Sequence, residues 1–437
     1  MDKSSRQRGV DAVRENRAFG SLLWVAVATL LITACAPGEE AAEETGSTEV
    51  PDEIVIGATL PLTGEESSAG GYFKEGYELA FEEVTDAGGL QVGDKKVEVS
   101  LKLLDDTSDQ ATAVNLAERL ITRDGVDFLL GTYSTSLVEA QSTVAEQNQI
   151  PYVNGGGAAT SIYSRDYKWI FGALAPVELL GRTQMDWIAE QQEAGNLSEP
   201  AKIALLWENT SHGDDYRVGI TEFAEQSGGA FEVVVDESFE LDSKDFGALL
   251  SEVKSSDAHL LLADAHLPDF VTMQRQYVSS DLCHEVITYG ARGSERDAAE
   301  ALGEENVAYI LSAVWWHPLL VEQQEETNRE FIDAFNEKYG RDPEWYQALG
   351  YEAARALFTG IEEAGSVDRE AVRTALSELE MDSLVPGGKL SFPAEDGNQA
   401  QYPFLVQQNI PGEGAPIVYP EELATGEGVA PNPECKG

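Results

Sequence analysis

Basic residues, cysteines and long apolar runs are all scarce in this 437-residue sequence, and each shortage excludes a class of protein. Only 29 Lys and Arg stand against 78 Asp and Glu, which gives a formal charge of −49. Such a polyanion repels phosphate backbones, so nucleic-acid binding is excluded as a main function. Three cysteines are too few for a disulfide-rich miniature scaffold or a four-cysteine zinc site. After residue 34 no run approaches 18 apolar residues, so no later segment is long enough to span a bilayer.

Apolar and aromatic side chains, by contrast, are plentiful. The composition is 42% hydrophobic, with 15 Phe, 15 Tyr and 7 Trp, which is enough to build packed cores and excludes a disordered or fibrous protein. The chain contains no Gly-x-Ser-x-Gly elbow, no His-Glu-x-x-His and no phosphate loop that ends in Lys-Ser/Thr. We therefore predict that it is not an enzyme and needs no cofactor.

The first 35 residues have the layout of a secretory signal. Five basic residues between positions 3 and 17 precede an uncharged, mostly apolar run over 18–34, and Cys35 follows. The alternative is an uncleaved membrane anchor, although 17 residues are at the lower limit for spanning a bilayer. The segment Ile32-Thr33-Ala34-Cys35 resembles the bacterial lipoprotein box, in which the cysteine becomes the lipidated first residue. We predict a signal peptide over 1–34, a lipid on Cys35 and a chain held on the outer face of the membrane (periplasm or cell surface).

The acidity is not confined to the segment after the leader. Residues 35–52 are small and acidic, and they read as a solvated tether because they have too few apolar side chains to offset their ordering entropy. Residues 54–437 still contain 68 acidic and 24 basic residues, a formal charge of −44. Self-repulsion on this scale nearly vanishes at a salt concentration of about 1 M, where the Debye length is about 3 Å. The balance indicates a high-salt habitat; the alternative is an acidic secreted protein that is stable enough to tolerate its charge.

From residue 54 onward the pattern alternates between short apolar runs and amphipathic segments. The runs that predict strands are 54–60, 97–104, 126–130, 151–153, 203–207, 231–235, 259–263, 286–289 and 307–314. The segments that predict helices are 72–87, 110–122, 136–147, 176–192, 214–226, 244–254, 268–277, 325–339, 345–363 and 369–379. Such alternation predicts an α/β fold, and the length predicts two doubly wound parallel-sheet lobes with a cleft between the carboxyl ends of their strands.

Several motifs, in order along residues 53–420, resemble the branched-chain amino-acid-binding family of ABC-transporter substrate-binding proteins. Residues 54–64 (IVIGATLPLTG) resemble the family's first strand and loop, and 105–109 (DDTSD) its paired acidic residues. Residues 351–354 (YEAA) with 364–366 (AGS) resemble its late helices. The resemblance implies the type I periplasmic-binding fold with a three-segment hinge. It divides the chain into lobe 1, 53–172 plus 316–385, and lobe 2, 173–315 plus 386–437.

The resemblance also implies a function: a monomer that captures a small molecule between its lobes and delivers it to an ABC permease in the membrane. An extracytoplasmic sensor of the same fold, docking on a signalling partner, is the alternative. Loops at two strand ends match the family's carboxylate clamp. By this match Ser134 holds the ligand carboxylate, and the backbone at Ala158 with the hydroxyl of Thr160 completes the clamp. Small hydroxyls and free N–H groups at a helix start favour an anion, although two ordinary capped turns would look alike.

The second lobe departs from the family pattern at three aligned positions. His212 and His266 fall where amino-acid binders place aromatic residues, and Arg292 falls where they place the glutamate that pairs with the α-ammonium group. The substitution reverses the sign of that contact, so we predict a ligand with an anionic or acceptor group at its far end: a carboxylate, a dicarboxylate or an amide. The alternative for Arg292 is an ion pair with Glu295 or Asp297 that points away from the cleft; each histidine has the alternative of a surface or hydrogen-bonded role.

Three further predictions concern the second lobe and the hinge. Trp315 and Trp316 lie near the second crossing between lobes, and we predict that Trp316 closes over the ligand; packing of the hinge is the alternative. Cys283 and Cys435 both belong to lobe 2, where a disulfide would hold the C-terminal tail. No metal is predicted, because His212 has only the neighbouring acids at 214 and 215 as companions at metal-site spacing.

Overall fold

The computed structural model describes residues 50–435. The predicted signal peptide, the lipidation site Cys35 and most of the predicted tether lie outside the described residues. The helices are α1 (Ser67–Asp86), α2 (Gln110–Thr122), α3 (Thr135–Gln147), α4 (Thr160–Tyr163), α5 (Val177–Glu193), α6 (Ser211–Gln226), α7 (Gly247–Ser255), α8 (Leu267–Ser279), α9 (Arg296–Leu302), α10 (Glu325–Tyr339), α11 (Trp345–Ala364) and α12 (Arg369–Ser377), with short 3₁₀ turns η1 (Glu304–Asn306), η2 (Pro318–Glu322), η3 (Ala394–Asp396) and η4 (Glu421–Leu423).

The strands form two large sheets and one small ribbon. They are β1 (Glu53–Leu60), β2 (Leu90–Val92), β3 (Lys95–Asp105), β4 (Phe128–Leu130), β5 (Tyr152–Asn154), β6 (Ile170–Gly172), β7 (Ala201–Glu208), β8 (Phe231–Phe239), β9 (Leu260–Asp264), β10 (Val286–Tyr289), β11 (Leu311–Val314), β12 (Glu380–Asp382), β13 (Lys389–Ser391), β14 (Leu405–Gln408) and β15 (Ile417–Tyr419). The ribbon is the pair β12–β13.

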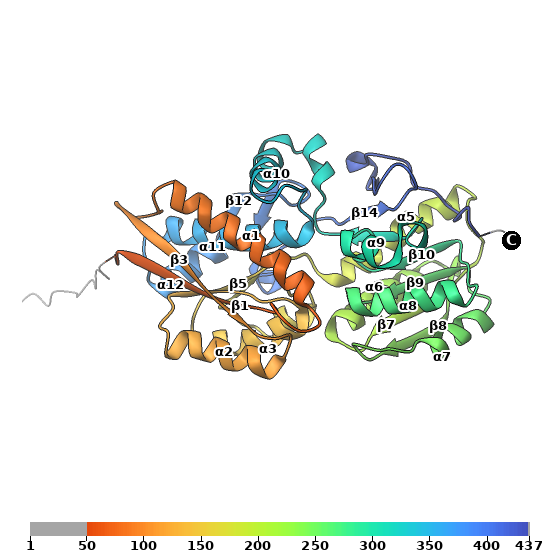
Figure 1. Cartoon of the computed structure of the whole chain (residues 1–437), viewed down its shortest axis with the longest axis horizontal. Coiled ribbons are helices and arrows are strands. Elements are labelled where there is room, and N and C mark those ends of the chain that lie inside the picture. Colours follow the sequence, from red (N-terminus) through yellow and green to blue (C-terminus); the bar gives the residue numbers. More distant parts are fainter. Residues whose placement is uncertain (1–49, 436–437) are drawn as a thin grey trace, which may run out of the picture. The chain divides into compact units, whose positions relative to one another are not determined.

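The first sheet has the strand order β2-β3-β1-β4-β5-β6, and every neighbouring pair except β2–β3 is parallel. Helices α1 and α11 pack together over one face, and α2 and α3 pack together over the other (Figure 1). After β1 the chain forms β2 and β3 on one side of that strand, and it then crosses to form β4 on the other side. Ligands of open α/β sheets bind beyond the carboxyl ends of the strands at such a reversal.

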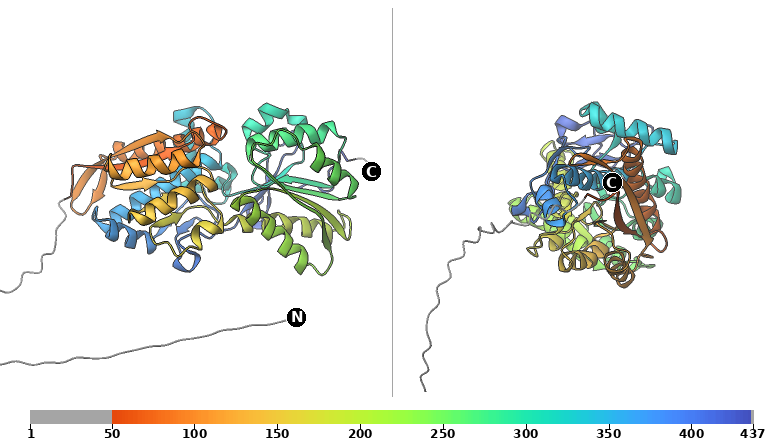
Figure 2. Two further views of the ribbon diagram at one scale, coloured as in Figure 1. Left: turned by 90° about the horizontal axis from the view of Figure 1, so that it is seen from below. Right: turned by 90° about the vertical axis from the view of Figure 1, so that its left-hand side faces the viewer.

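The second sheet has the order β15-β14-β11-β10-β9-β7-β8. The five strands from β8 to β11 run parallel, whereas β14 and β15 are antiparallel additions at one edge. Helices α5 and α6 cover one face, and α8 and α9 the opposite face (Figures 1 and 2). The order of the strands reverses at β7, which lies between β8 and β9, so the carboxyl ends of β7 and β9 are the position where a ligand is expected.

The chain passes between the two sheets three times: after β6, after β11 and before β14. Helix α11, which follows the second crossing, packs against α1, so this late part of the sequence belongs with the first sheet. The lobe boundaries given above, 53–172 plus 316–385 and 173–315 plus 386–437, stay a prediction in their detail.

Alternation along the buried strands explains why helices cover both faces. Successive side chains of a strand point to opposite faces. In β7, Ile203 and Leu205 enter the core under α5 and α6, while Ala204 and Leu206 enter the core under α7, α8 and α9. A strand with consecutive apolar residues at its centre, such as 203–206 of β7, therefore needs a helix layer on each side.

The α/β fold with two mostly parallel sheets confirms the predicted fold class, with two corrections. Both sheets are mixed rather than wholly parallel, because short antiparallel strands at their edges carry too weak a pattern to be recognised in sequence. The predicted strand over 307–314 is too long: Tyr309 adopts a φ of 59°, which interrupts an extended chain, and β11 begins only at Leu311. None of the helices described over 50–435 is long and apolar enough to cross a membrane.

Candidate functional site

One cavity lies where the carboxyl ends of strands from the two sheets face each other. Its lining comes from the loops after β4, β5, β6, β7, β9, β10 and β11 and from the start of α11: Tyr133, Ser134, Thr135, Gly156, Ala158, Leu174, His212, His266, Arg292, Trp315 and Trp345. The cavity volume is about 10 Å³, which is roughly the room that one water molecule needs. The two walls meet in this conformation, so a larger ligand requires them to separate.

The lining contains five of the seven residues that the sequence nominated for ligand binding: Ser134, Ala158, His212, His266 and Arg292. These residues come from separate loops of two sheets, and folding brings them to one place. Thr160 and Trp316 do not belong to the lining.

The wall from the first sheet offers neutral hydrogen-bond donors. Ser134 is the residue before α3, and its side chain makes no capping bond to that helix. The N–H of Ala158 donates to Oγ1 of Thr135 over a long 3.3 Å. A Cβ on Gly156 would lie 2.2 Å from the carbonyl oxygen of Thr132, so glycine is required for the two loops to approach each other. Since α3 begins here, its positive end favours an anion.

Thr160 differs from its predicted role, because a carboxylate of the protein itself occupies its donors. The backbone N–H of Thr160 donates to Oδ2 of Asp215 at 2.6 Å, and its hydroxyl donates to the same carboxylate at 3.0 Å. Thr160 is the first residue of α4, and Asp215 lies in α6, so this contact joins the first sheet's side to the second. Thr160 therefore contributes to closure in this conformation and not to the lining of the cavity.

The wall from the second sheet contains two buried histidine–carboxylate pairs. His212 donates from Nδ1 to Oδ2 of Asp264 at 2.7 Å, and His266 donates from Nδ1 to Oε2 of Glu208 at 2.6 Å. Both carboxylates end their strands, β7 and β9, at the point where the sheet reverses. All four side chains are buried. The histidines are therefore the hydrogen-bonded kind that the sequence left open, and they also line the cavity.

The pair of His266 and Glu208 is charged near neutral pH. Burial alone lowers the pKa of His266, but the carboxylates of Glu208 and Glu66 outweigh it and raise the pKa to about 9. Burial likewise acts to raise the pKa of Glu208, and the two neighbouring histidines outweigh it, so that pKa is lowered. His266 thus presents a protonated ring to the cleft. Its Nδ1 donates to Glu208, and its Nε2 makes no hydrogen bond.

Arg292 is 3% exposed and lines the same cavity. Its Nη2 donates to the hydroxyl of Tyr133 at 2.7 Å, and its guanidinium lies 5.5 Å from the ring centroid of Trp345. The predicted alternative also holds in part, because Nε lies 3.5 Å from Oε1 of Glu295. That distance leaves Nε without a hydrogen bond, and Nη1 has none either.

The two neighbouring tryptophans, Trp315 and Trp316, point to different sides of the chain. Trp315 lines the cavity and donates from Nε1 to the carbonyl of Ala175 at 2.8 Å. Trp316 turns away, donates from Nε1 to Oδ1 of Asn328 at 2.6 Å and packs against Phe331. Trp316, which the sequence predicts to close over the ligand, thus lies outside the lining, and Trp315 lies in it, because successive side chains of an extended segment point to opposite sides.

Sequence reasoning missed Glu208, Asp264 and Trp345. The first two could have been found, since each is an acid that directly ends an otherwise apolar strand. Trp345 follows a long separation in sequence and enters the cavity only because α11 packs on the first sheet.

Glu208, His212 and Asp264 also bring three potential metal ligands within 4.8 Å of one another, which the sequence did not foresee. Their atoms already hydrogen-bond within the histidine–carboxylate pairs. The N-termini of α6 and α8 begin beside them and favour negative over positive charge. The arrangement therefore suits an anion better than a cation.

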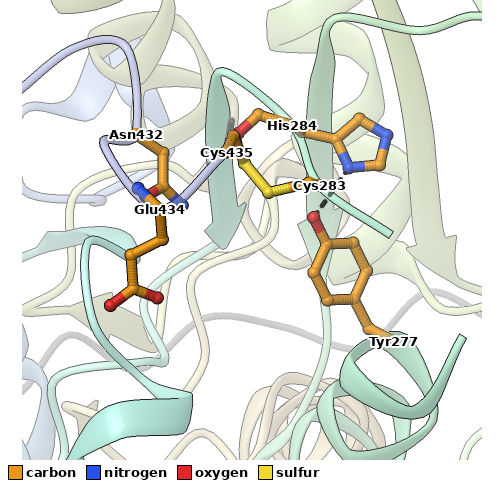
Figure 3. The surroundings of a disulfide bond; sticks show 6 residues. All are labelled: Tyr277, Cys283, His284, Asn432, Glu434 and Cys435. Atoms are coloured by element: carbon orange, nitrogen blue, oxygen red, sulfur yellow. Dashed lines mark hydrogen bonds between the residues drawn. A yellow bond between two sulfur atoms is a disulfide. The ribbon is translucent and has the colours of Figure 1, made fainter. Parts of the chain in front are cut away.

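Away from the cavity, Cys283 and Cys435 form a disulfide (Figure 3). Next to it the hydroxyl of Tyr277 lies 2.8 Å from Nδ1 of His284. The N–H of Asn432 donates to the carbonyl of Glu285 at 2.8 Å. The covalent bond and this hydrogen bond hold the C-terminal tail at the start of β10.

The fold and the cavity define a class of protein: two α/β halves that contribute to one ligand site between them. The family model described as "Periplasmic binding protein" matches residues 53–414. The chain belongs to the periplasmic binding protein family. Since this is a family of binding proteins, the prediction that the chain is not an enzyme is confirmed.

Relatives of known name share this architecture. The leucine-, isoleucine-, valine-, threonine- and alanine-binding protein of Pseudomonas aeruginosa is 26% identical over 359 residues, which cover 82% of this chain and 90% of that protein. The branched-chain amino acid transporter substrate-binding protein LivJ of Streptococcus pneumoniae, solved with isoleucine, aligns with a TM-score of 0.72 at 18% identity, covering 84% of this chain and all of that one. A solute-binding protein of an ABC transporter from R. palustris, solved with benzoate, aligns with a TM-score of 0.72 at 20% identity, covering 86% and 98%.

Proposed function

We propose that this protein captures a small molecule bearing a carboxylate or an amide and delivers it to an ABC permease. The observation that carries the proposal is the single cavity lined by Ser134 and Ala158 from one sheet and by His212, His266 and Arg292 from the other. Donors from both sides converge on it, which suits a ligand with acceptor groups. The names of the relatives, which bind amino acids or benzoate, support a solute of this size.

An ordinary zwitterionic amino acid fits this cavity poorly. An α-ammonium group requires a carboxylate or several acceptors, and the lining contains neither Asp nor Glu. Instead it contains the guanidinium of Arg292 and the protonated ring of His266. At 4 Å and an effective dielectric constant near 20, two like charges repel by roughly 4 kcal/mol. A ligand with a carboxylate and no charged amine fits better. Its carboxylate can pair with Arg292 and His266, and an apolar or aromatic body can pack against Tyr133, Trp315 and Trp345.

Closure of the two halves is the mechanism that the contacts support. Several hydrogen bonds join the side of the first sheet to the side of the second, among them Thr160 to Asp215, Arg292 to Tyr133, Ser211 to Glu139, Tyr346 to Glu295 and Tyr72 to Asp297. An open form would lose them. A ligand that contacts both walls stabilises the closed form by the free energy of those contacts, and the population shifts toward closure.

The proposal also includes a lipid on Cys35 and an acidic tether, and these two parts rest on the sequence alone. A lipid anchor on the outer face of the membrane would keep the closed, loaded protein close to its permease, and the tether would let the binding domain turn. We expect the binding unit to act as a monomer. Loss of uptake in a deletion strain distinguishes transport from a purely signalling role.

A thermal-shift panel at high salt tests the proposal. Neutral amino acids, aromatic acids, dicarboxylates and amides would each be added to the purified protein. A true ligand at 100 times its dissociation constant raises the free energy of unfolding by about 2.7 kcal/mol. A carboxylate or amide that stabilises the protein while leucine does not is the expected result; stabilisation by leucine alone would contradict it.

A further inference from the structure

Arg292, which lines the cavity on the side of the second sheet, has donors without a partner. Nε and Nη1 of Arg292 are buried and have no hydrogen-bond partner. Buried charged donors nearly always find an acceptor, because leaving one unpaired forfeits its solvation. Glu295 is the counter-ion of Arg292, but its Oε1 accepts from the hydroxyl of Tyr346 at 2.6 Å and stays 3.5 Å from Nε, and its Oε2 has no hydrogen-bond partner either. The charge of the guanidinium is therefore paired, while two of its nitrogens still lack an acceptor.

The two histidines add donors to the same wall. Each ring is fixed through Nδ1, His212 by Asp264 and His266 by Glu208. Nε2 of each ring makes no hydrogen bond, and Nε2 of His266 lies 3.9 Å from Oε1 of Glu66. The rings lie 5.9 Å apart, centroid to centroid, and both line the cavity with Arg292. The carboxylates behind them act as positioning residues.

We propose that the ligand is a dicarboxylate. Its first carboxylate lies at Ser134 and the start of α3, and its second binds Arg292, His212 and His266. This inference rests on the proposed function, because it names the ligand class of the same site. It predicts a specificity that differs from that of amino-acid binders.

Isothermal titration calorimetry on the full-length chain in detergent and high salt tests the inference. Matched probe pairs isolate the second carboxylate: succinate against butyrate, and terephthalate against benzoate. We expect at least one dicarboxylate to bind about tenfold or more tightly than its partner.

Variants assign the effect to the proposed wall. Arg292→Gln should weaken the dicarboxylate by about 10- to 100-fold, more than it weakens the matching monocarboxylate, since a bond to a charged donor is lost. Arg292→Lys keeps the charge but loses the planar guanidinium, so its affinity for the dicarboxylate should lie between those of the natural protein and Arg292→Gln. Arg329→Gln, which removes an exposed charge on α10, is the matched control. Circular dichroism establishes that each variant is folded.

The outcomes separate the two proposals. Equal affinities within both probe pairs, or a dicarboxylate affinity unaffected by either Arg292 variant, would overturn the dicarboxylate inference while leaving capture of a carboxylate intact. If no carboxylate or amide of any kind binds, the proposed function itself fails.

Discussion

Replacing Glu208 by Gln tests how the buried pair with His266 couples stability to pH. Nδ1 of His266 lies 2.6 Å from Oε2 of Glu208, and both side chains are buried. Against the effect of burial, the carboxylates of Glu208 and Glu66 raise the pKa of His266 from 6.5 to about 9. A group whose pKa is raised by folding stabilises the native state fully below its unfolded pKa and loses that contribution as pH rises through the folded pKa.

The magnitude follows from that window. Between pH 6.5 and about 9 the folded protein holds a proton that the unfolded chain has released. The free energy of unfolding then falls by about 1.4 kcal/mol for each pH unit. From pH 7.5 to pH 9 the loss is therefore about 2 kcal/mol. In Glu208→Gln the attraction that raised the pKa is largely gone, so the decline should nearly disappear.

Urea unfolding at pH 7.5 and pH 9, followed by tryptophan fluorescence at constant high salt, measures the effect. Glu232→Gln, an exposed acid at the start of neighbouring β8, is the matched control and should keep the decline of the natural sequence. Glu344, whose pKa burial raises to about 7, titrates alike in all three proteins and cancels in the comparison. A natural sequence with constant stability over this range, or a Glu208→Gln variant that declines as steeply, would refute the reasoning.

Three further predictions concern other parts of the molecule. The free energy of unfolding should rise between 0.1 M and 1 M KCl, because the Debye length falls from about 10 Å to about 3 Å; a flat urea midpoint would contradict this. Cys283→Ser should cost about 2–5 kcal/mol in urea unfolding, since the bond to Cys435 closes a loop with a sequence separation of 152, and reduction of the natural protein should match it. Trp316→Phe should cost about 1–3 kcal/mol of stability without changing ligand affinity, whereas Trp315→Phe should weaken binding; calorimetry showing the reverse would restore the sequence-based assignment.

Much of the site could be predicted because it lies at strand ends. Ser134, Ala158, His212, His266 and Arg292 each lie close behind an apolar run, and the carboxyl ends of parallel strands share one edge of a sheet. The family resemblance identifies these residues position by position, and the topology that it implies places them at one edge. Local pattern alone locates only the strand ends and the loops that follow them.

The partners of those residues could not be predicted in this way. The carboxylate of Asp215 on Thr160 and the acids behind the two histidines come from segments more than fifty residues away. Which side chain occupies a donor depends on how helices of one half approach loops of the other. A shift of one residue along the chain changes which side chain faces the cavity: Trp315 lines it, whereas Trp316 donates to Asn328.

The sequence by itself determined the α/β alternation, the acidity and the loops that carry the donors, because hydrophobic period and composition act locally along the chain. Only the tertiary structure decided that Thr160 holds a carboxylate of the protein, that Trp345 enters the cavity and that two nitrogens of Arg292 stay unpaired. These are properties of distances between remote segments. They are set by the packing of whole sheets and helices against each other, where many weak contacts outweigh any local preference.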